Sequence, residues 1–434
     1  FNADNQTGRL RTYLRFGDDK GRTYRLSHVL SYSDIGHPGF ISSPSYRKSK
    51  RLSQYIQGHG FYPISKGLSM SHSVFFNKFD THYYPLNDFP ISYQDTVQTH
   101  YDDLTAGFRS EMLITRWARW IVMAGTDVDW SHSDVEVFHA IYDTPSQLSV
   151  GAFIQSKYSI GNGWNFGSGL RYDYRRSDPG DNYKKRIYKN LSPKINIVYT
   201  SQGKRAFTLA YSEGFRAPSL SELYLHYTSY YGLTMQGNPS LLPEKVQAIE
   251  IMYEHPHSDA WFWSISIFHN RYENMIDFVY NLPILAMNRK GITGTGLEYQ
   301  VRWHPIEKLN LTASYAYLDM TDRGGEPILY RSKHRGQVNI KYQTTLIDIQ
   351  LGLQAWSKQI YEDFLSEESH YNFPIGELPE RIVPELVLSR EINYFKGSMH
   401  ITNLFDTKYE LIQDFPMPGR TWKFTLTKTI TKEL

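Results

Sequence analysis

The stretch GLEYQVRWHPIEKLNLTASYAY (296–317) alternates apolar and polar residues with a period of two on either side of a short break. The apolar residues are Leu297, Tyr299, Val301 and Trp303 before the break, and Leu311, Ala313, Tyr315 and Tyr317 after it. Successive side chains of a β-strand point to opposite faces, so the pattern predicts two antiparallel strands joined by the turn HPIEK (304–308). The same alternation recurs at Phe207–Tyr211 and Val338–Tyr342.

The connections between such segments indicate which kind of sheet they form. Short turns occur at GDDKGR (17–22), YPISKG (62–67), SQGK (201–204) and HPIEK (304–308). They alternate with long polar connections at 33–50, 85–103, 131–146, 176–189, 215–243 and 359–379. Short turns on one rim and long loops on the other are typical of outer-membrane β-barrels, whereas alternation alone also fits a soluble half-buried sheet.

The composition excludes several other classes of protein. Apolar residues make up 40% of the 434 residues and form no run near the roughly 20 that a membrane-spanning helix requires. A net charge of +3 without a basic stripe gives no reason to expect nucleic acid, and the lack of Cys excludes disulfides and thiolate metal sites. The 34 Tyr suit the aromatic girdles of a transmembrane barrel. No linker divides the chain, which favours one large unit.

Counting segments in this way predicts nineteen strands, from one near Gly8–Phe16 to one near Arg420–Thr429. Bacterial barrels have even strand numbers, and the large plugged ones have 22 strands. We therefore expect residues 1–434 to be strands 4 to 22 of an all-β, antiparallel barrel whose first three strands and plug lie outside them. An open arc would leave unpaired edges in lipid, so another segment must close it. The alternative is a 19-stranded barrel with one parallel pair.

From about Trp164 onward the chain resembles the barrel of TonB-dependent transporters. The motifs that carry the resemblance, in order, are GSGLRYDYR (167–175), LSPKINIVYT (191–200), AYSEGFRAPSLSELY (210–224), GNPSLLPEKVQAIEI (237–251), NMIDFVYN (274–281), NRKGITGTGLEYQ (288–300), ITNLFDTKYE (401–410) and PGRTWKFTL (418–426). We interpret them as strand ends and turns rather than chemistry; Asn403 and Asp406, for example, can satisfy local backbone groups. The resemblance implies a plug and the TonB–ExbB–ExbD energy-transducing system as partners. No segment of residues 1–434 resembles the plug. The sequence ends in KTITKEL (428–434), where barrels of this family usually end on an aromatic residue.

One connection stands out as a candidate ligand site. It holds Tyr224, His226, Tyr227, Tyr230, Tyr231 and Met235, which offer aromatic faces and hydroxyl donors to a large ligand. The segment resembles haem receptors of the family, in which FRAP and NPNL boxes flank an axial His that would map onto His226. The boxes are widespread in the family and do not select haem. The last strands resemble the cobalamin receptors instead, although residues 34–51 lack the acidic calcium-binding loops of that subgroup.

Catalytic and metal sites find little support in the sequence. No nucleotide-binding, zinc-protease or serine-hydrolase motif occurs, so we expect no enzyme, no catalytic residues and no cofactor. Weak metal candidates are Asp127, Asp129, Asp134 and Glu136, with His132 and His139 nearby, because hard cations take several carboxylate oxygens. The favoured explanation is that Asp127 and Asp129 face a wet lumen and that the others lie in a solvated loop. The same holds for Asp102 and Asp103.

The function we expect is TonB-dependent import of a large, scarce ligand across the outer membrane of a Gram-negative bacterium. Cobalamin is the first candidate, followed by a ferric siderophore or haem. The expected partners are outer-membrane lipid, the transported ligand, and a plug-bearing segment or companion chain, but no nucleic acid. The alternative is a passive porin or a structural barrel within a larger assembly.

Overall fold

The computed structural model describes residues 4–39, 44–85, 99–137, 140–141, 144–180, 184–228, 234–258, 260–279, 284–363 and 374–428. They divide into two compact units. Unit 1 comprises residues 1–197, 211–247 and 272–290, and unit 2 comprises residues 198–210, 248–271 and 291–434. Among the described residues no helix has both the length and the apolar character needed to cross a membrane.

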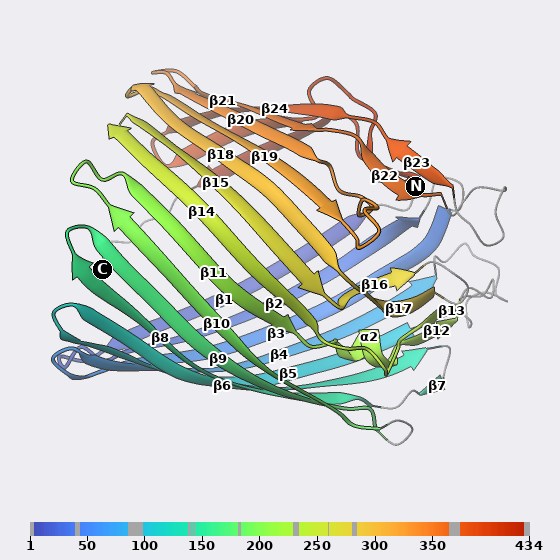
Figure 1. Ribbon diagram of the computed structural model, residues 1–434. Coiled ribbons are helices and arrows are strands. Elements are labelled where there is room, and N and C mark those ends of the chain that lie inside the picture. The colour runs from blue at the N-terminus through green and yellow to red at the C-terminus, as the bar shows by residue number, and fades with distance from the viewer. Residues whose placement is uncertain are drawn as a thin grey trace. The chain divides into compact units, whose positions relative to one another are not determined.

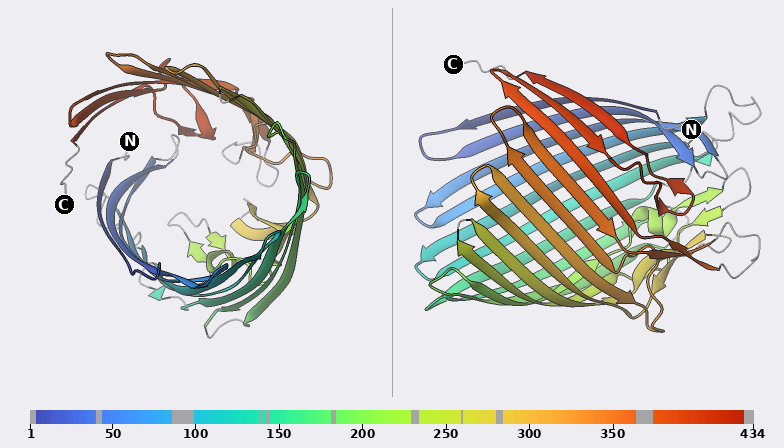
Figure 2. Two further views of the ribbon diagram at one scale, coloured as in Figure 1. Left: turned by 90° about the vertical axis from the view of Figure 1, so that its left-hand side faces the viewer. Right: turned by 90° about the horizontal axis from the view of Figure 1, so that it is seen from above.

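Unit 1 is dominated by long antiparallel strands in chain order (Figures 1 and 2). They are β1 (Asn5–Gly17), β2 (Thr23–Gly39), β3 (Pro44–Ser65), β4 (Leu68–Pro85), β5 (Thr99–Trp117), β6 (Trp120–Val137), β7 (Ala140–Ile141), β8 (Ser146–Gly161) and β9 (Trp164–Asp178). Each of β1–β5 pairs with the next strand, and β6 pairs with both β7 and β8. β8 then pairs with β9.

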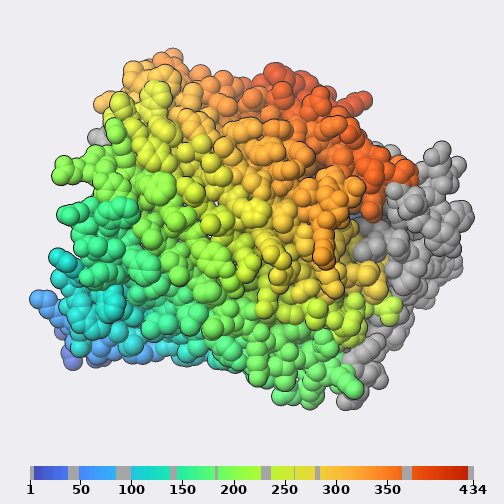
Figure 3. Space-filling model, in the orientation of Figure 1, coloured from blue at the N-terminus to red at the C-terminus, as the bar shows by residue number. Residues whose placement is uncertain are grey.

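Unit 2 repeats this arrangement with strands of the second half of the chain. They are β18 (Ile292–Ile306), β19 (Leu309–Thr321), β20 (His334–Gln343), β21 (Asp348–Trp356), β24 (Arg381–Ile392), β25 (Phe395–Thr402) and β28 (Thr421–Lys428). Each pairs antiparallel with the next. The short hairpins β22 (Gln359–Glu362)/β23 (Ile375–Leu378) and β26 (Glu410–Ile412)/β27 (Phe415–Pro416) leave this sheet. Figure 3 shows the side chains of β18–β20, in yellow to orange, as a continuous layer.

The boundary between the units runs through four strands. These are β10 (Arg186–Thr200), β11 (Ala206–Arg216), β14 (Glu244–Ser258) and β15 (Trp261–Glu273). Twenty strands are assigned to the main sheet of the described residues, and one of them, β7, has only two residues. The predicted count of nineteen substantial strands is therefore confirmed.

The strand register brings the predicted apolar faces together. Tyr299 lies opposite Tyr315, and Trp303 lies opposite Leu311. Leu311 in turn lies opposite Ile340 of the next strand. Directly opposite residues of a sheet share a face, so three strands that were predicted separately form one continuous apolar face.

These apolar faces are exposed, which decides between a core and a lipid environment. Trp303 is 39% exposed, Trp130 is 40% exposed, and Phe424 reaches 73%. Few large apolar residues of the described chain are fully buried. A soluble sheet would cover such a face, whereas a transmembrane barrel presents it to lipid and keeps its polar face inside.

The short turns form where the sequence predicts them, but several predicted long connections are wrong over part of their length. Asp18 closes the first turn by accepting hydrogen bonds from the backbone N–H groups of Lys20 (3.0 Å) and Arg22 (2.9 Å). The predicted connections 33–50 and 131–146 are instead largely strand, because β2 runs to Gly39 and β6 to Val137. These segments form paired strands although they are polar, because a strand with water on both faces shows no alternation of apolar and polar residues.

Candidate functional site

The predicted ligand loop contains a small folded platform. It consists of helix α2 (Leu220–Tyr224) and a four-stranded sheet of β12 (His226–Thr228), β13 (Thr234–Gln236), β17 (Ile284–Arg289) and β16 (Met275–Val279). β13 and β17 are parallel, whereas the other two pairs are antiparallel. Within unit 1 the platform lies on the concave side of the long strands (Figure 2, left). We refer to these elements as the platform.

Helix α2 starts at a capping box that the sequence analysis missed. The side chain of Ser219 accepts a hydrogen bond from the N–H of Glu222, and the Glu222 carboxylate accepts one from the N–H of Ser219 at 2.8 Å. The S-x-x-E spacing at 219–222 is the signal that predicts such a start. Because the box satisfies exposed N–H groups of the first turn, a helix of only five residues can persist.

The platform has its own apolar core. Leu223 and Ala286 are fully buried, Leu241 is 1% exposed, and Tyr224, Ile276 and Phe278 pack around them. Burial raises the pKa of Tyr224 to about 12, so its phenol stays neutral at physiological pH. Residues from three separate chain segments share this core, so the platform is held by tertiary packing and not by local propensity.

Three charged residues fix the platform to β11 and β14. Arg216 donates to both carboxylate oxygens of Glu222, at 3.0 and 2.9 Å, and to Glu244 at 2.5 Å. Glu244 also accepts the N–H of Ile276 at 2.6 Å. Burial raises the pKa of Glu222, but the donors from Arg216 and Ser219 outweigh it and hold that pKa below its ordinary value.

Two of the family-like motifs serve as structural ties, as expected. Asn238 donates its side-chain amide to the carbonyl of Ala286 at 3.0 Å, and its backbone N–H donates to the carbonyl of Glu222 at 2.8 Å. A Cβ at Gly237 would lie 2.6 Å from the backbone nitrogen of Tyr224, so only glycine allows this approach. Asn403 accepts the N–H of Thr407 at 2.9 Å, which confirms its predicted backbone role.

A cleft of about 470 Å³ lies between α2 and the strands beside it. Its lining includes Asp103, Ser131 and Gln147 from the strands and Ser221 and Tyr224 from the helix. Gln147 is buried and donates to Ser177 (2.7 Å) and to the carbonyl of Pro218 (3.2 Å), which positions the entry to the helix. One side of the cleft is therefore fixed by hydrogen bonds, and its lining extends to Leu225, the residue before β12.

The six predicted ligand residues fall into three groups. Tyr224 ends α2 and lines the cleft. His226 and Tyr227 lie in β12, where Tyr227 is the register partner of Met235 in β13. Tyr230 and Tyr231 lie outside the described residues. The structure thus brings four of the six onto one platform.

The weak metal candidates do not converge on one point. Asp127 and Asp129 have odd positions on β6, whereas Asp134 and Glu136 have even positions, so the two pairs point to opposite faces. Asp127 already accepts bidentate hydrogen bonds from the Arg171 guanidinium, at 2.8 and 3.0 Å. A set of four carboxylates around one ion is therefore not present. His139 lies outside the described residues.

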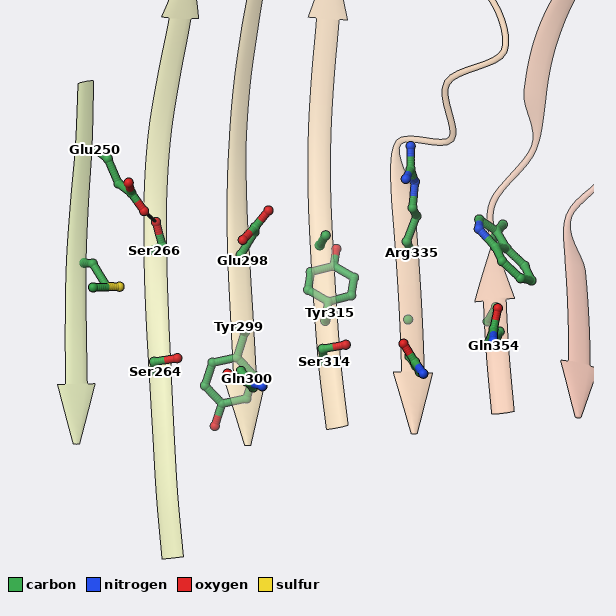
Figure 4. A pocket seen from close by; sticks show the side chains of 16 residues that line it. Glu250, Ser264, Ser266, Glu298, Tyr299, Gln300, Ser314, Tyr315, Arg335 and Gln354 are labelled. Carbon is green, nitrogen blue, oxygen red and sulfur yellow. Dashed lines mark hydrogen bonds between the residues drawn. The ribbon is translucent and has the colours of Figure 1, made fainter. Parts of the chain in front are cut away.

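Unit 2 contributes a second candidate surface, a cavity of about 530 Å³ along β14–β21. Four polar residues, Gln300, Ser314, Gln337 and Gln354, are register partners across four neighbouring strands and form a polar ladder. Figure 4 shows Glu250 and Ser266 at one side of it, joined by a 2.5 Å hydrogen bond. Polar side chains on the face opposite the exposed apolar one are typical of a barrel lumen.

Comparison with known proteins decides the family. The family model "TonB dependent receptor-like, beta-barrel" matches residues 1–374, which is most of the chain. The chain belongs to this family. The predicted family, the antiparallel barrel fold and the outer membrane of a Gram-negative bacterium are thereby confirmed for the receptor. Solved structures with this fold are named as transporters and receptors.

Solved structures share the receptor's fold at low sequence identity. The "Copper transporter OprC" superposes with a TM-score of 0.81 at 13% identity, covering 98% of this chain and 72% of that one. The FrpB iron transporter from Neisseria meningitidis (F5-1 variant) gives a TM-score of 0.76 at 14% identity, covering 98% and 73%. At these identities the likeness concerns the fold alone.

Two curated relatives from Haemophilus influenzae match short segments more closely. "Hemoglobin-binding protein A" is 39% identical over 72 residues, which are 17% of this chain and 7% of the relative. "Probable hemoglobin and hemoglobin-haptoglobin-binding protein 4" is 36% identical over 124 residues, which are 24% of this chain and 12% of the relative. The matches therefore span a small part of each relative's length.

Proposed function

We propose that the receptor imports a large iron-bearing ligand, with haem as the first candidate, by coupling to the TonB–ExbB–ExbD system. The observation that carries this is the platform, which fixes the backbone on which His226 and Tyr227 stand. A neutral imidazole is a common ligand of haem iron, and aromatic side chains provide faces for a planar ring. The names of the two H. influenzae relatives support the choice of haem over cobalamin.

In this proposal the import path needs parts outside residues 1–434. Every residue of β1, which pairs with β2, and every residue of β28, which pairs with β25, is exposed. Exposure over a whole strand indicates a sheet edge, and an open edge in lipid leaves several backbone groups unpaired. We infer that three further strands complete 22, and that a plug borne by the same or a companion chain closes the lumen.

Ligand competition tests the identity of the cargo. Cells carrying the intact receptor are incubated with haem, cobalamin or a ferric siderophore, and binding of labelled haem is measured. We expect unlabelled haem to compete, and His226→Ala to weaken haem binding by about tenfold or more, the loss of roughly one metal–ligand contact. The double variant Tyr230→Ala/Tyr231→Ala should also weaken it.

The other outcomes assign the cargo elsewhere. If labelled haem does not bind and labelled cobalamin does, the cargo is the corrin ligand that the last strands suggested. Gln337→Ala, on the polar ladder away from the platform, is the matched control and should leave haem affinity unchanged. Equal loss in that control would mean that the binding site is not on the platform.

A further inference from the structure

Three metal-ligating side chains converge where β4 and β5 enter the connection between them. The register places Asp80 opposite Asp102 and His82 opposite His100. The Nε2 atoms of His82 and His100 lie 2.9 and 3.2 Å from the same Oδ1 atom of Asp80. The ligand atoms of Asp80, His82 and His100 all lie within 4.8 Å of one another.

We propose that Asp80, His82 and His100 form a binding site for a divalent late transition metal, zinc first. Two imidazole nitrogens and one carboxylate oxygen suit Zn²⁺, Ni²⁺ and Cu²⁺ better than Ca²⁺ or Mg²⁺, which prefer oxygen ligands alone. Three protein ligands leave a fourth position to water. To bind the metal, each imidazole must be neutral and present an unprotonated Nε2, so its one ring proton lies on Nδ1.

The geometry requires a modest change on binding. The two imidazole rings are stacked, with centroids 3.9 Å apart and planes 8° from parallel. Lone pairs of parallel rings do not meet at one ion, so at least one ring must rotate. The side chain of His82 is 56% exposed and has room to turn, whereas that of His100 is 33% exposed.

The charged residues around the cluster form ion pairs or contacts of their own. Lys78, the cation nearest along the strand, pairs with Asp102 at 3.0 Å. His132 pairs with Asp134 at 3.2 Å on the next strand. Lys50 lies opposite His82 on β3, with its ammonium 4.8 Å from the centre of the Tyr84 ring, and Glu136 lies opposite His100 on β6. Asp80 is the carboxylate that contacts both imidazoles of the cluster.

The metal site is separate from the platform. Asp80 and His82 share a strand face with Val74, which is 54% exposed and lies opposite the exposed Phe108. This is the apolar, outward face of the sheet, whereas Asp103 of the platform cleft lies on the other face. A metal here ties β4 to β5 outside the lumen, so its test is independent of the imported ligand.

Copper spectroscopy on the intact receptor tests the ligand set. The protein is purified in detergent, stripped of metal and loaded with one equivalent of Cu²⁺ for electron paramagnetic resonance. We expect hyperfine splitting from two imidazole nitrogens in the wild type and from one in His82→Asn. His59 lies outside the cluster and forms a hydrogen bond with Ser73, so His59→Asn should keep the wild-type spectrum.

Zinc titration supplies the second measurement. Calorimetry should give one Zn²⁺ site that Asp80→Asn weakens by about tenfold or more. Added Zn²⁺ should slow amide exchange at the facing ends of β4 and β5. Identical copper spectra in the wild type and His82→Asn, or equal zinc affinity in the wild type and Asp80→Asn, would overturn the site. His226→Ala should leave both results unchanged, so a wrong cargo and a wrong metal site are told apart.

Discussion

The platform of unit 1 and the polar ladder of unit 2 both present polar groups, but they hold them in different ways. The platform joins a capped helix, a charged triad and an apolar core around Leu223. The ladder consists of side chains on a strand wall, each positioned by its own backbone. A binding element built on a loop therefore requires an apolar core to fix its side chains. On a lumen wall the backbone pairing of the sheet already fixes them.

The largest expected effect comes from opening the platform core. Leu241 is 1% exposed and its neighbour Leu242 is 45% exposed, so the pair forms a built-in control. Leu241→Ala should raise the free energy of the folded platform by about 2–5 kcal/mol, as large-to-small core changes do. Leu242→Ala should change it by at most about 0.5 kcal/mol. Amide exchange over residues 220–225 measures both; equal protection in the two variants would mean that no core holds the platform.

Glu222→Gln should have a smaller effect of about 1–2 kcal/mol, the usual cost of weakening hydrogen bonds to a charged group, because the Gln amide oxygen can still accept the Ser219 N–H. The side chain keeps its shape but no longer carries the charge that Arg216 contacts. The same exchange experiment measures the loss. Wild-type protection in this variant would show that the charged triad does not hold the helix.

The platform should also depend on pH through Glu222. Its pKa is lower in the folded protein than in the unfolded chain, so the stability it contributes is present above the unfolded value and is lost as the pH falls through the folded value. Exchange over 220–225, corrected for intrinsic rates, should therefore become faster in acid. Glu222→Gln should remove this dependence; if it persists, another group titrates.

The ladder should respond least. Gln337→Ala removes one partner of the row and should change stability by at most about 0.5 kcal/mol, since no buried group depends on it. Thermal unfolding of the receptor in detergent measures this. A change as large as that of Leu241→Ala would show that the wall is a cooperative network like the platform.

The same contrast explains what the sequence could predict. Strands such as 296–303 are readable because lipid and lumen impose a period of two, and register then follows from matched apolar faces. The platform was not readable, because its core joins Leu223, Leu241 and Ala286 across long stretches of chain. Only the S-x-x-E spacing at 219–222 pointed to the helix.

The site residues show the same limit. Tyr224, His226, Tyr227 and Met235 were predicted as a loop because aromatic residues are dense there, and the structure places them on the platform. Asp80, His82 and His100 were not singled out. Their pairing depends on the register of β4 and β5, which no local pattern near Asp80 determines.

The most direct test of the central claim measures haem uptake by cells that carry the intact receptor, with and without collapse of the proton gradient. Energy-coupled import predicts that uptake stops when the gradient is lost while surface binding of haem continues. Uptake that proceeds at the same rate without the gradient would contradict the account and identify a passive channel.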